Sequence, residues 1–144
     1  MIRVYTDASV STNKAVVTII VLTDQAFLGY KVAQFSDIKT SLHGELLGIL
    51  EGVNYVKSLD LAEDDIIFHT DCIDAVRLIR NEFSKIPKYA RDILDEIQSF
   101  IDGTCVCIEH IQGHQTKHNP NKIADLVSRS VLRNILKGEK VHEN

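Results

Sequence analysis

Four acidic residues that are far apart in the sequence stand either where a carboxylate could reach a site or where its burial would be costly. They are Asp7, Glu45, Asp71 and Asp125. Asp7 stands near the end of a predicted first strand, and Asp71 directly follows an apolar run at 65–70. Open α/β sheets carry their sites at the carboxyl ends of strands, so both positions favour a common site. Taken alone, each acid is weak evidence, because an aspartate at a strand end is commonly a turn or capping residue.

Glu45 lies on the apolar face of a helix predicted over 40–57, because it follows Leu42 by three residues and precedes Ile49 by four. Burying an unpaired carboxylate is costly, so such a group is normally paired, protonated or bound to a metal. The alternative is an edge position from which the carboxylate reaches water. Two glycines four residues apart in this helix, Gly48 and Gly52, predict a close approach to a neighbouring backbone, that of the sheet.

The other two acids also have structural interpretations. Asp71 would serve as the N-cap of a helix predicted over 73–83, with Asp74 in a position typical of a capping box. Asp125 falls in the first turns of a last helix, where it would complement the helix dipole. Neither interpretation excludes a functional role, since a cap residue at the carboxyl end of a strand also faces the site, and Asp125 is next to Ala124 on the buried stripe and could lean toward the sheet.

A polar loop over 112–121 precedes this last helix and carries His114 and His118. A histidine on such a loop can move and can transfer protons near neutral pH, and His114 fits that role better than His118 does. Clustered carboxylates with few nitrogens and no thiolates suit the hard cations Mg²⁺ or Mn²⁺. Two such ions about 3.5–4 Å apart can activate a water and stabilise the leaving oxygen of a phosphodiester displacement. The residues therefore favour metal-dependent phosphodiester chemistry.

The elements that must position these residues follow the order βββαβααβα. Three strands at 1–9, 15–24 and 26–35 predict an antiparallel meander, and two further strands at 65–70 and 104–111 complete a five-stranded mixed sheet flanked by helices. Helical patterns fall between and after these strands: at 40–57, at 73–83, from Pro87 to Gly103, and from Asn119-Pro120 onward, the last with a buried stripe of Ala124, Val127, Val131 and Ile135.

Length and composition indicate one α/β domain over 1–137, followed by a polar tail over 138–144. Apolar residues make up 44% of the 144 residues, and no apolar run is long enough to span a membrane. No signal-peptide pattern is present, so we expect a cytoplasmic protein. The net charge of −4 means that a nucleic-acid partner would need a local basic patch or a metal-neutralised site. The three cysteines form neither a disulfide framework nor a zinc pattern, so we expect buried, reduced thiols.

Four short motifs resemble those of one family, ribonuclease H of type 1. They are YTDAS at 5–9, HGEL at 43–46, HTDC at 69–72, and QGH at 112–114 followed by Asn121 and the Ala124-Asp125 pair. Each motif is short, but their combination is specific, and the order of the predicted elements matches the family over nearly the whole chain. The resemblance implies a ribonuclease H-like fold.

By this resemblance, Asp7, Glu45, Asp71 and Asp125 would be the catalytic, metal-binding acids, and His114 would assist proton transfer or product release. The substrate would be the RNA strand of an RNA–DNA hybrid, cut to leave a 5′-phosphate and a 3′-hydroxyl. Two Mg²⁺ or Mn²⁺ ions would bind with the substrate.

The chain departs from the family pattern mainly in its substrate contacts. The segment after Asp7 lacks the usual glycines and prolines, and the basic protrusion that some members use looks absent. The weak candidates for substrate contacts are Asn13, Lys14, Ser41 and Asn121. A thinned contact surface predicts weak affinity for the hybrid, or a protein partner that delivers the substrate to a monomeric enzyme.

Two alternatives stay open at this point. One is a nuclease of the same fold that acts on another substrate, such as branched DNA. The other is a non-catalytic module that binds nucleic acid or another protein, and the acidic balance of the chain motivates it.

Overall fold

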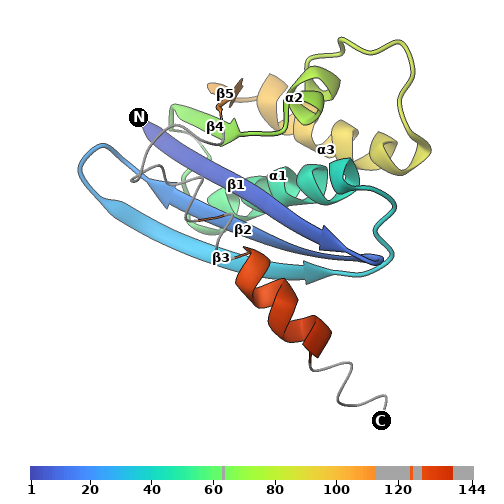
Figure 1. Cartoon of the computed structure of the whole chain (residues 1–144). Coiled ribbons are helices and arrows are strands. Elements are labelled where there is room, and N and C mark those ends of the chain that lie inside the picture. Colours follow the sequence, from blue (N-terminus) through green and yellow to red (C-terminus); the bar gives the residue numbers. More distant parts are fainter. Residues whose placement is uncertain (63, 113–123, 125–127, 138–144) are drawn as a thin grey trace.

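A five-stranded mixed sheet forms the centre of the computed structural model, which describes residues 1–62, 64–112, 124 and 128–137. The strands lie in the order β3-β2-β1-β4-β5, as Figure 1 shows. The first three strands pair antiparallel, whereas β4 pairs parallel to β1 and β5 pairs parallel to β4. This arrangement confirms the predicted mixed sheet. The bounds are β1 (Ile2–Ser11), β2 (Lys14–Leu22), β3 (Phe27–Phe35), β4 (Ile66–Thr70) and β5 (Val106–His110).

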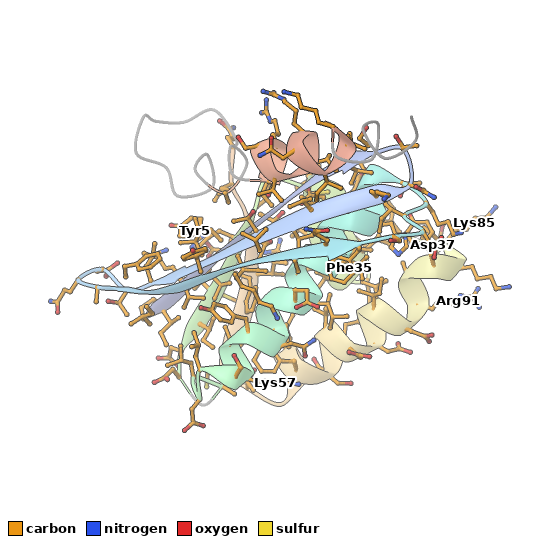
Figure 2. The ribbon with its side chains drawn as sticks, turned by 90° about the horizontal axis from the view of Figure 1, so that it is seen from below. Tyr5, Phe35, Asp37, Lys57, Lys85 and Arg91 are labelled. Carbon is orange, nitrogen blue, oxygen red and sulfur yellow. The ribbon has the colours of Figure 1, made fainter. Side chains whose placement is uncertain are left out.

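Helices lie on both faces of the sheet. Helices α1 (Ser41–Ser58) and α3 (Arg91–Asp102) lie on one face, and the helical residues 128–137 lie on the other (Figure 2). The short α2 (Ile73–Ile79) follows β4, and the 3₁₀ helix η1 (Lys88–Ala90) leads directly into α3. Helix α1 begins after Thr40, whose side-chain oxygen accepts a hydrogen bond from the His43 amide, as an N-cap does.

Helix α1 packs against β1 along a row of glycines. A Cβ atom built on Gly44 would lie 2.6 Å from Val10 Cγ2, and one built on Gly52 would lie 3.0 Å from Phe68 Cε1. A Cβ on Gly48 would lie 3.5 Å from Val17 and 3.9 Å from the Asp7 carbonyl oxygen. The absence of side chains at these positions therefore lets α1 lie close to the sheet, as the glycine spacing predicts.

The second face of the sheet is joined to the helical residues 128–137 by a buried polar contact. The Thr18 and Ser128 hydroxyl oxygens lie 2.7 Å apart, and Ser128 Oγ also lies 3.5 Å from the Asp7 carbonyl oxygen, to which it donates. With the Ser128 proton directed at Asp7, the Thr18 hydroxyl donates to Ser128. Both side chains are completely buried, so no water replaces the Ser128 oxygen as the acceptor for the Thr18 hydroxyl.

We expect Ser128→Ala to lower the free energy of unfolding by about 1–3 kcal/mol, because the buried Thr18 hydroxyl then loses its acceptor. The double variant Thr18→Val/Ser128→Ala should cost less than the sum of the two single changes, since both polar groups are removed together. Urea unfolding measures all three values, and Ser130→Ala on the exposed face of the same helix is the control. Strict additivity would contradict a direct Thr18–Ser128 bond.

Several sequence-based predictions differ from the structure in detail. Strand β1 continues to Ser11, so Asp7 lies within the strand rather than near its end. Helix α2 ends at Ile79 instead of residue 83, and Asn81 follows with a left-handed φ of 60°. The predicted buried thiols are wrong for two cysteines, because Cys105 and Cys107 are exposed and only Cys72 is partly buried.

The buried stripe predicted for the last helix is confirmed at Ala124 and differs at Val131 and Ile135, whereas Val127 lies outside the described residues. Ala124, Ser128 and Leu132 are buried, whereas Val131 and Ile135 are only partly buried. The apolar pattern passed over Ser128, because a serine becomes favourable in the interior only when a partner such as Thr18 is present.

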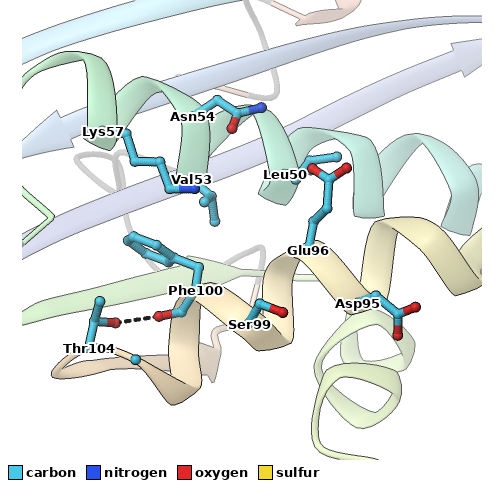
Figure 3. Close-up of a pocket in the computed structure, with 10 residues that line it drawn as sticks. Leu50, Val53, Asn54, Lys57, Asp95, Glu96, Ser99, Phe100 and Thr104 are labelled. Atoms are coloured by element: carbon cyan, nitrogen blue, oxygen red, sulfur yellow. Dashed lines mark hydrogen bonds between the residues drawn. The ribbon is translucent and has the colours of Figure 1, made fainter.

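A hollow of about 580 Å³ lies between α1 and α3 (Figure 3). Lys57 from α1 lies over the Phe100 ring at 5.3 Å, and Glu96 from α3 points toward α1. None of the predicted site residues that the structure describes lines this hollow. Among the described residues, none of the helices combines the length and apolar character that crossing a membrane requires.

Candidate functional site

Three carboxylates from three different elements meet at one place in the structure. Asp7 comes from β1, Glu45 from α1, and Asp71 from the residue that follows β4. One carboxylate oxygen from each residue lies within 4.8 Å of the others. Asp7 is buried and the other two are partly buried. The structure thus brings together three of the four acids that the sequence singles out.

The parallel pairing of β1 with β4 places Asp7 beside Asp71. Tyr5 pairs with His69 in this register, and each of the two acids lies two residues further along its own strand direction. Residues two positions apart in a strand point to the same face, so the two carboxylates lie side by side at the same level of the sheet. Glu45 completes the group, because α1 passes over β1 with Gly48 beside the Asp7 carbonyl.

The end of β4 is fixed by hydrogen bonds around Asp71. The Ile111 amide donates to the Thr70 carbonyl at 2.9 Å, and the Cys72 amide donates to Thr70 Oγ1 at 3.2 Å. His110 Nε2 lies 3.2 Å from the Asp71 carbonyl oxygen and donates to it. The N-cap of α2 is Cys72 rather than Asp71, so the capping interpretation of Asp71 is wrong.

A second set of contacts involves the residues that precede Asp7 and Asp71 by two positions, and the sequence did not lead us to predict it. The Tyr5 and His69 rings stack at 4.6 Å, and Arg3 Nη1 donates to His69 Nε2 at 3.1 Å. Because a guanidinium only donates, Nε2 must accept, and the ring proton resides on Nδ1. Burial and the nearby Arg3 charge lower the pKa of His69, which agrees with a neutral ring. The available signal was that Tyr5 and His69 each precede an acid by two residues.

The thiol of Cys72 lies beside the carboxylates but does not belong to the group of atoms that converge within 4.8 Å. Burial, together with the charges of Glu45, Asp74 and Asp71, raises its pKa to about 11 against a lowering hydrogen bond from the Ala75 backbone. In the absence of a metal the thiol is therefore protonated at neutral pH and is not a nucleophile. Among the described residues, the converging group consists of carboxylates alone.

The remaining predicted site residues divide into two groups. Asp125, His114 and Asn121 lie outside the described residues. The others lie where β2 and α1 begin: Asn13 and Ser41 are exposed and Lys14 is partly buried. The Asn13 carbonyl accepts a hydrogen bond from the Ile38 amide at 2.9 Å, which holds the segment before α1 against the turn between β1 and β2.

A protein-family model described as reverse transcriptase-like matches residues 5–131. The chain belongs to this reverse transcriptase-like family. No curated protein sequence matches the chain significantly.

Solved structures of similar shape place this family member in the ribonuclease H type 1 fold. RNase H1 from the halophilic archaeon Halobacterium salinarum has a TM-score of 0.77 and 14% sequence identity, covering 92% of this chain and 98% of that one. LC11-RNase H1 in complex with an RNA/DNA hybrid has a TM-score of 0.78 and 14% sequence identity, and the match covers 94% of this chain and 99% of that one. The N-terminal RNase H domain of a Mycobacterium tuberculosis protein has a TM-score of 0.77 and 13% sequence identity, and the match covers 96% of this chain and 97% of that one. Identities this low establish the fold alone.

The donor set of this reverse transcriptase-like protein fits a hard divalent cation. Three carboxylates within 4.8 Å repel one another in the absence of a counter-charge, and oxygen ligands of this kind suit Mg²⁺ or Mn²⁺. Asp7, Glu45 and Asp71 are the residues that would hold the ion. The backbone contacts of Asp7 with Ser128 and of Asp71 with His110 fix two of these donors on the sheet.

We expect Mn²⁺ or Mg²⁺ to stabilise the folded protein, by about 2.7 kcal/mol at a concentration one hundred times the dissociation constant. Glu45→Gln should reduce this metal-dependent gain, because one of the three donors loses its charge. Thermal unfolding with and without the ion measures the gain, and Glu96→Gln on the exposed face of α3 serves as the matched control. An equal gain in wild type and Glu45→Gln would contradict the assignment of Glu45 as a ligand.

Proposed function

We propose that this protein is a metal-dependent endonuclease that hydrolyses the RNA strand of RNA–DNA hybrids. The observation that carries the proposal is the convergence of Asp7, Glu45 and Asp71 on one point of a ribonuclease H type 1 fold. LC11-RNase H1, which shares this fold, was solved in complex with an RNA/DNA hybrid, and this supports the choice of substrate. The products would carry a 5′-phosphate and a 3′-hydroxyl.

We propose the following roles for the residues of the site. Asp7 holds its carboxylate in a buried position on the central strand, where it cannot swing away. Glu45 approaches from the helix and Asp71 from the end of the neighbouring strand, so a cation at this point would be bounded by carboxylate ligands on more than one side. Divalent ions bound by these carboxylates would supply an activated water and would stabilise charge on the departing oxygen. We propose Asp125 as a fourth ligand and His114 as the group that assists proton transfer.

The proposal extends to how the hybrid is held. We propose Asn13, Lys14, Ser41 and Asn121 as contacts to the sugar–phosphate backbone or to 2′-hydroxyl groups, which distinguish RNA from DNA. Few such contacts, together with the net charge of −4, predict modest affinity at physiological salt. We therefore propose a monomeric, cytoplasmic enzyme that gains its substrate with the help of a partner protein.

The test is cleavage of an end-labelled RNA–DNA hybrid at low salt, with Mg²⁺ and separately with Mn²⁺. Single-stranded RNA, duplex DNA and a four-way DNA junction run beside it. We expect cutting of the RNA strand of the hybrid alone. Preferential cutting of the junction would favour the branched-DNA alternative, and hybrid binding without cleavage in either ion would favour the non-catalytic module.

A further inference from the structure

The exposed charged residues of the helix over 128–137 are all basic. Arg129, Arg133 and Lys137 are all exposed and follow one another at intervals of four residues. This interval keeps side chains on one face of a helix, so the three charges form a row about 12 Å long. No acidic residue occurs between 128 and 137. In a chain with a net charge of −4, this row is a local reversal of sign.

The basic row borders a groove that begins beside the carboxylate site. A hollow of about 450 Å³ lies between this helix and β1, and its lining includes Ser9, Arg129 and Arg133, with aliphatic side chains for the rest. None of the described residues that line it is acidic. Ser9 lies two residues after Asp7 on the same face of β1, about 7 Å further along the strand. The contact of Ser128 with the Asp7 carbonyl holds this part of the helix beside β1.

We propose that this groove binds phosphates of the nucleic-acid strand adjacent to the one at the carboxylates. Arg129 and Arg133 would bind phosphate oxygens, the Ser9 hydroxyl would donate to the same group, and Lys137 would extend the path. The inference rests on the proposed function, because the carboxylates are taken to mark where the strand is cut.

The chemistry of the groove selects a phosphodiester strand as its occupant. Arginine binds phosphate through paired, charge-assisted hydrogen bonds, and two arginines one helical turn apart provide two such donors. A polyanion approaching an acidic protein needs a basic path to overcome the general repulsion. The groove provides this path within two residues of Asp7, where a bound strand must pass.

The experiment measures binding rather than cleavage. Binding of a fluorescently labelled RNA–DNA hybrid is followed by anisotropy in EDTA over a series of salt concentrations, for wild type, Arg133→Gln and Lys57→Gln. Lys57 lies on α1, on the opposite side of the sheet (Figure 2), and its replacement removes the same charge. We expect Arg133→Gln to weaken binding roughly three- to tenfold. The slope of log K against log [salt] should fall by about 0.7–0.9, the value for one lost phosphate contact.

The charge-conserving variant Arg133→Lys should keep the wild-type salt slope, and Arg129→Gln should repeat the loss seen with Arg133→Gln. Equal effects of Arg133→Gln and Lys57→Gln, an unchanged slope, or no binding of the hybrid by wild type would overturn the proposal. Circular dichroism checks that each variant is folded. A changed salt slope in a protein that cuts no hybrid would support phosphate binding by the groove and contradict the proposed function. Cleavage of the hybrid together with an unchanged salt slope would support the proposed function and contradict phosphate binding by the groove.

Discussion

Asp7→Asn should cleave an RNA–DNA hybrid at least about a thousandfold more slowly than wild type, since several kcal/mol of transition-state stabilisation depend on the bound ions. The change keeps the size of the side chain and its buried position, but it removes the charge that faces Glu45 and Asp71. Single-turnover rates with saturating enzyme, in Mg²⁺ and in Mn²⁺, measure the loss independently of product release.

The same variant should be at least as stable as wild type when metal is absent. Three carboxylates within 4.8 Å repel one another, and replacing one of them with an amide relieves part of that repulsion. Thermal unfolding in EDTA measures this effect, and Asp95→Asn on the exposed face of α3 is the control for both assays. A rate close to that of wild type would remove Asp7 from the site, and a large loss of stability would show that its role is structural.

Phe68→Ala should lower the free energy of unfolding by about 3–5 kcal/mol, because it opens a cavity at the contact between β4 and α1. Phe68 is only 2% exposed, and its ring lies 3.0 Å from where a Cβ on Gly52 would stand. The ring and the glycine therefore fit each other, and Gly52→Ala alone should destabilise the wild-type protein.

In the Phe68→Ala background, the penalty of Gly52→Ala should become smaller. The added methyl then no longer meets the ring, and alanine is favoured over glycine in a helix by about 1 kcal/mol, but Thr6 Cγ2 would still lie 3.2 Å from the new Cβ. Gly48→Ala is the matched control, because its Cβ would make only ordinary contacts of 3.5 Å with Val17 and should be neutral or stabilising in both backgrounds. Urea unfolding of the five single and double variants measures the coupling, and an unchanged penalty of Gly52→Ala in the two backgrounds would contradict the packing of Phe68 on Gly52.

The sheet and three residues of the candidate site could be predicted from sequence because each signal was local. Alternating apolar residues marked the strands, and the position of Glu45 between Leu42 and Ile49 marked an acid directed away from water. That Asp7 and Asp71 lie at the same level could not be derived locally. It depends on the register in which β1 pairs with β4, and no spacing within either strand records that register.

The failures have physical causes of the same kind. Asp71 has the residue type and position of a helix cap, but Cys72 takes that place because Thr70 and His110 hold the residues around Asp71 in the strand. Ser128 was not included in the predicted buried stripe of its helix, since its buried partner Thr18 is distant in sequence. Thr18 itself carried a signal, as the one hydroxyl within the apolar run of β2.

The contact of Thr18 with Ser128 joins residues 110 positions apart, and this separation has a consequence for synthesis. At about 5–20 residues per second, β2 leaves the ribosome roughly 5–20 s before the helix that covers its second face. During that interval, Val16 and Thr18 have no covering helix, and the apolar surface around them is open to other chains. The nascent protein should therefore be a client of chaperones until Ser128 emerges, and a stalled chain should aggregate through this face.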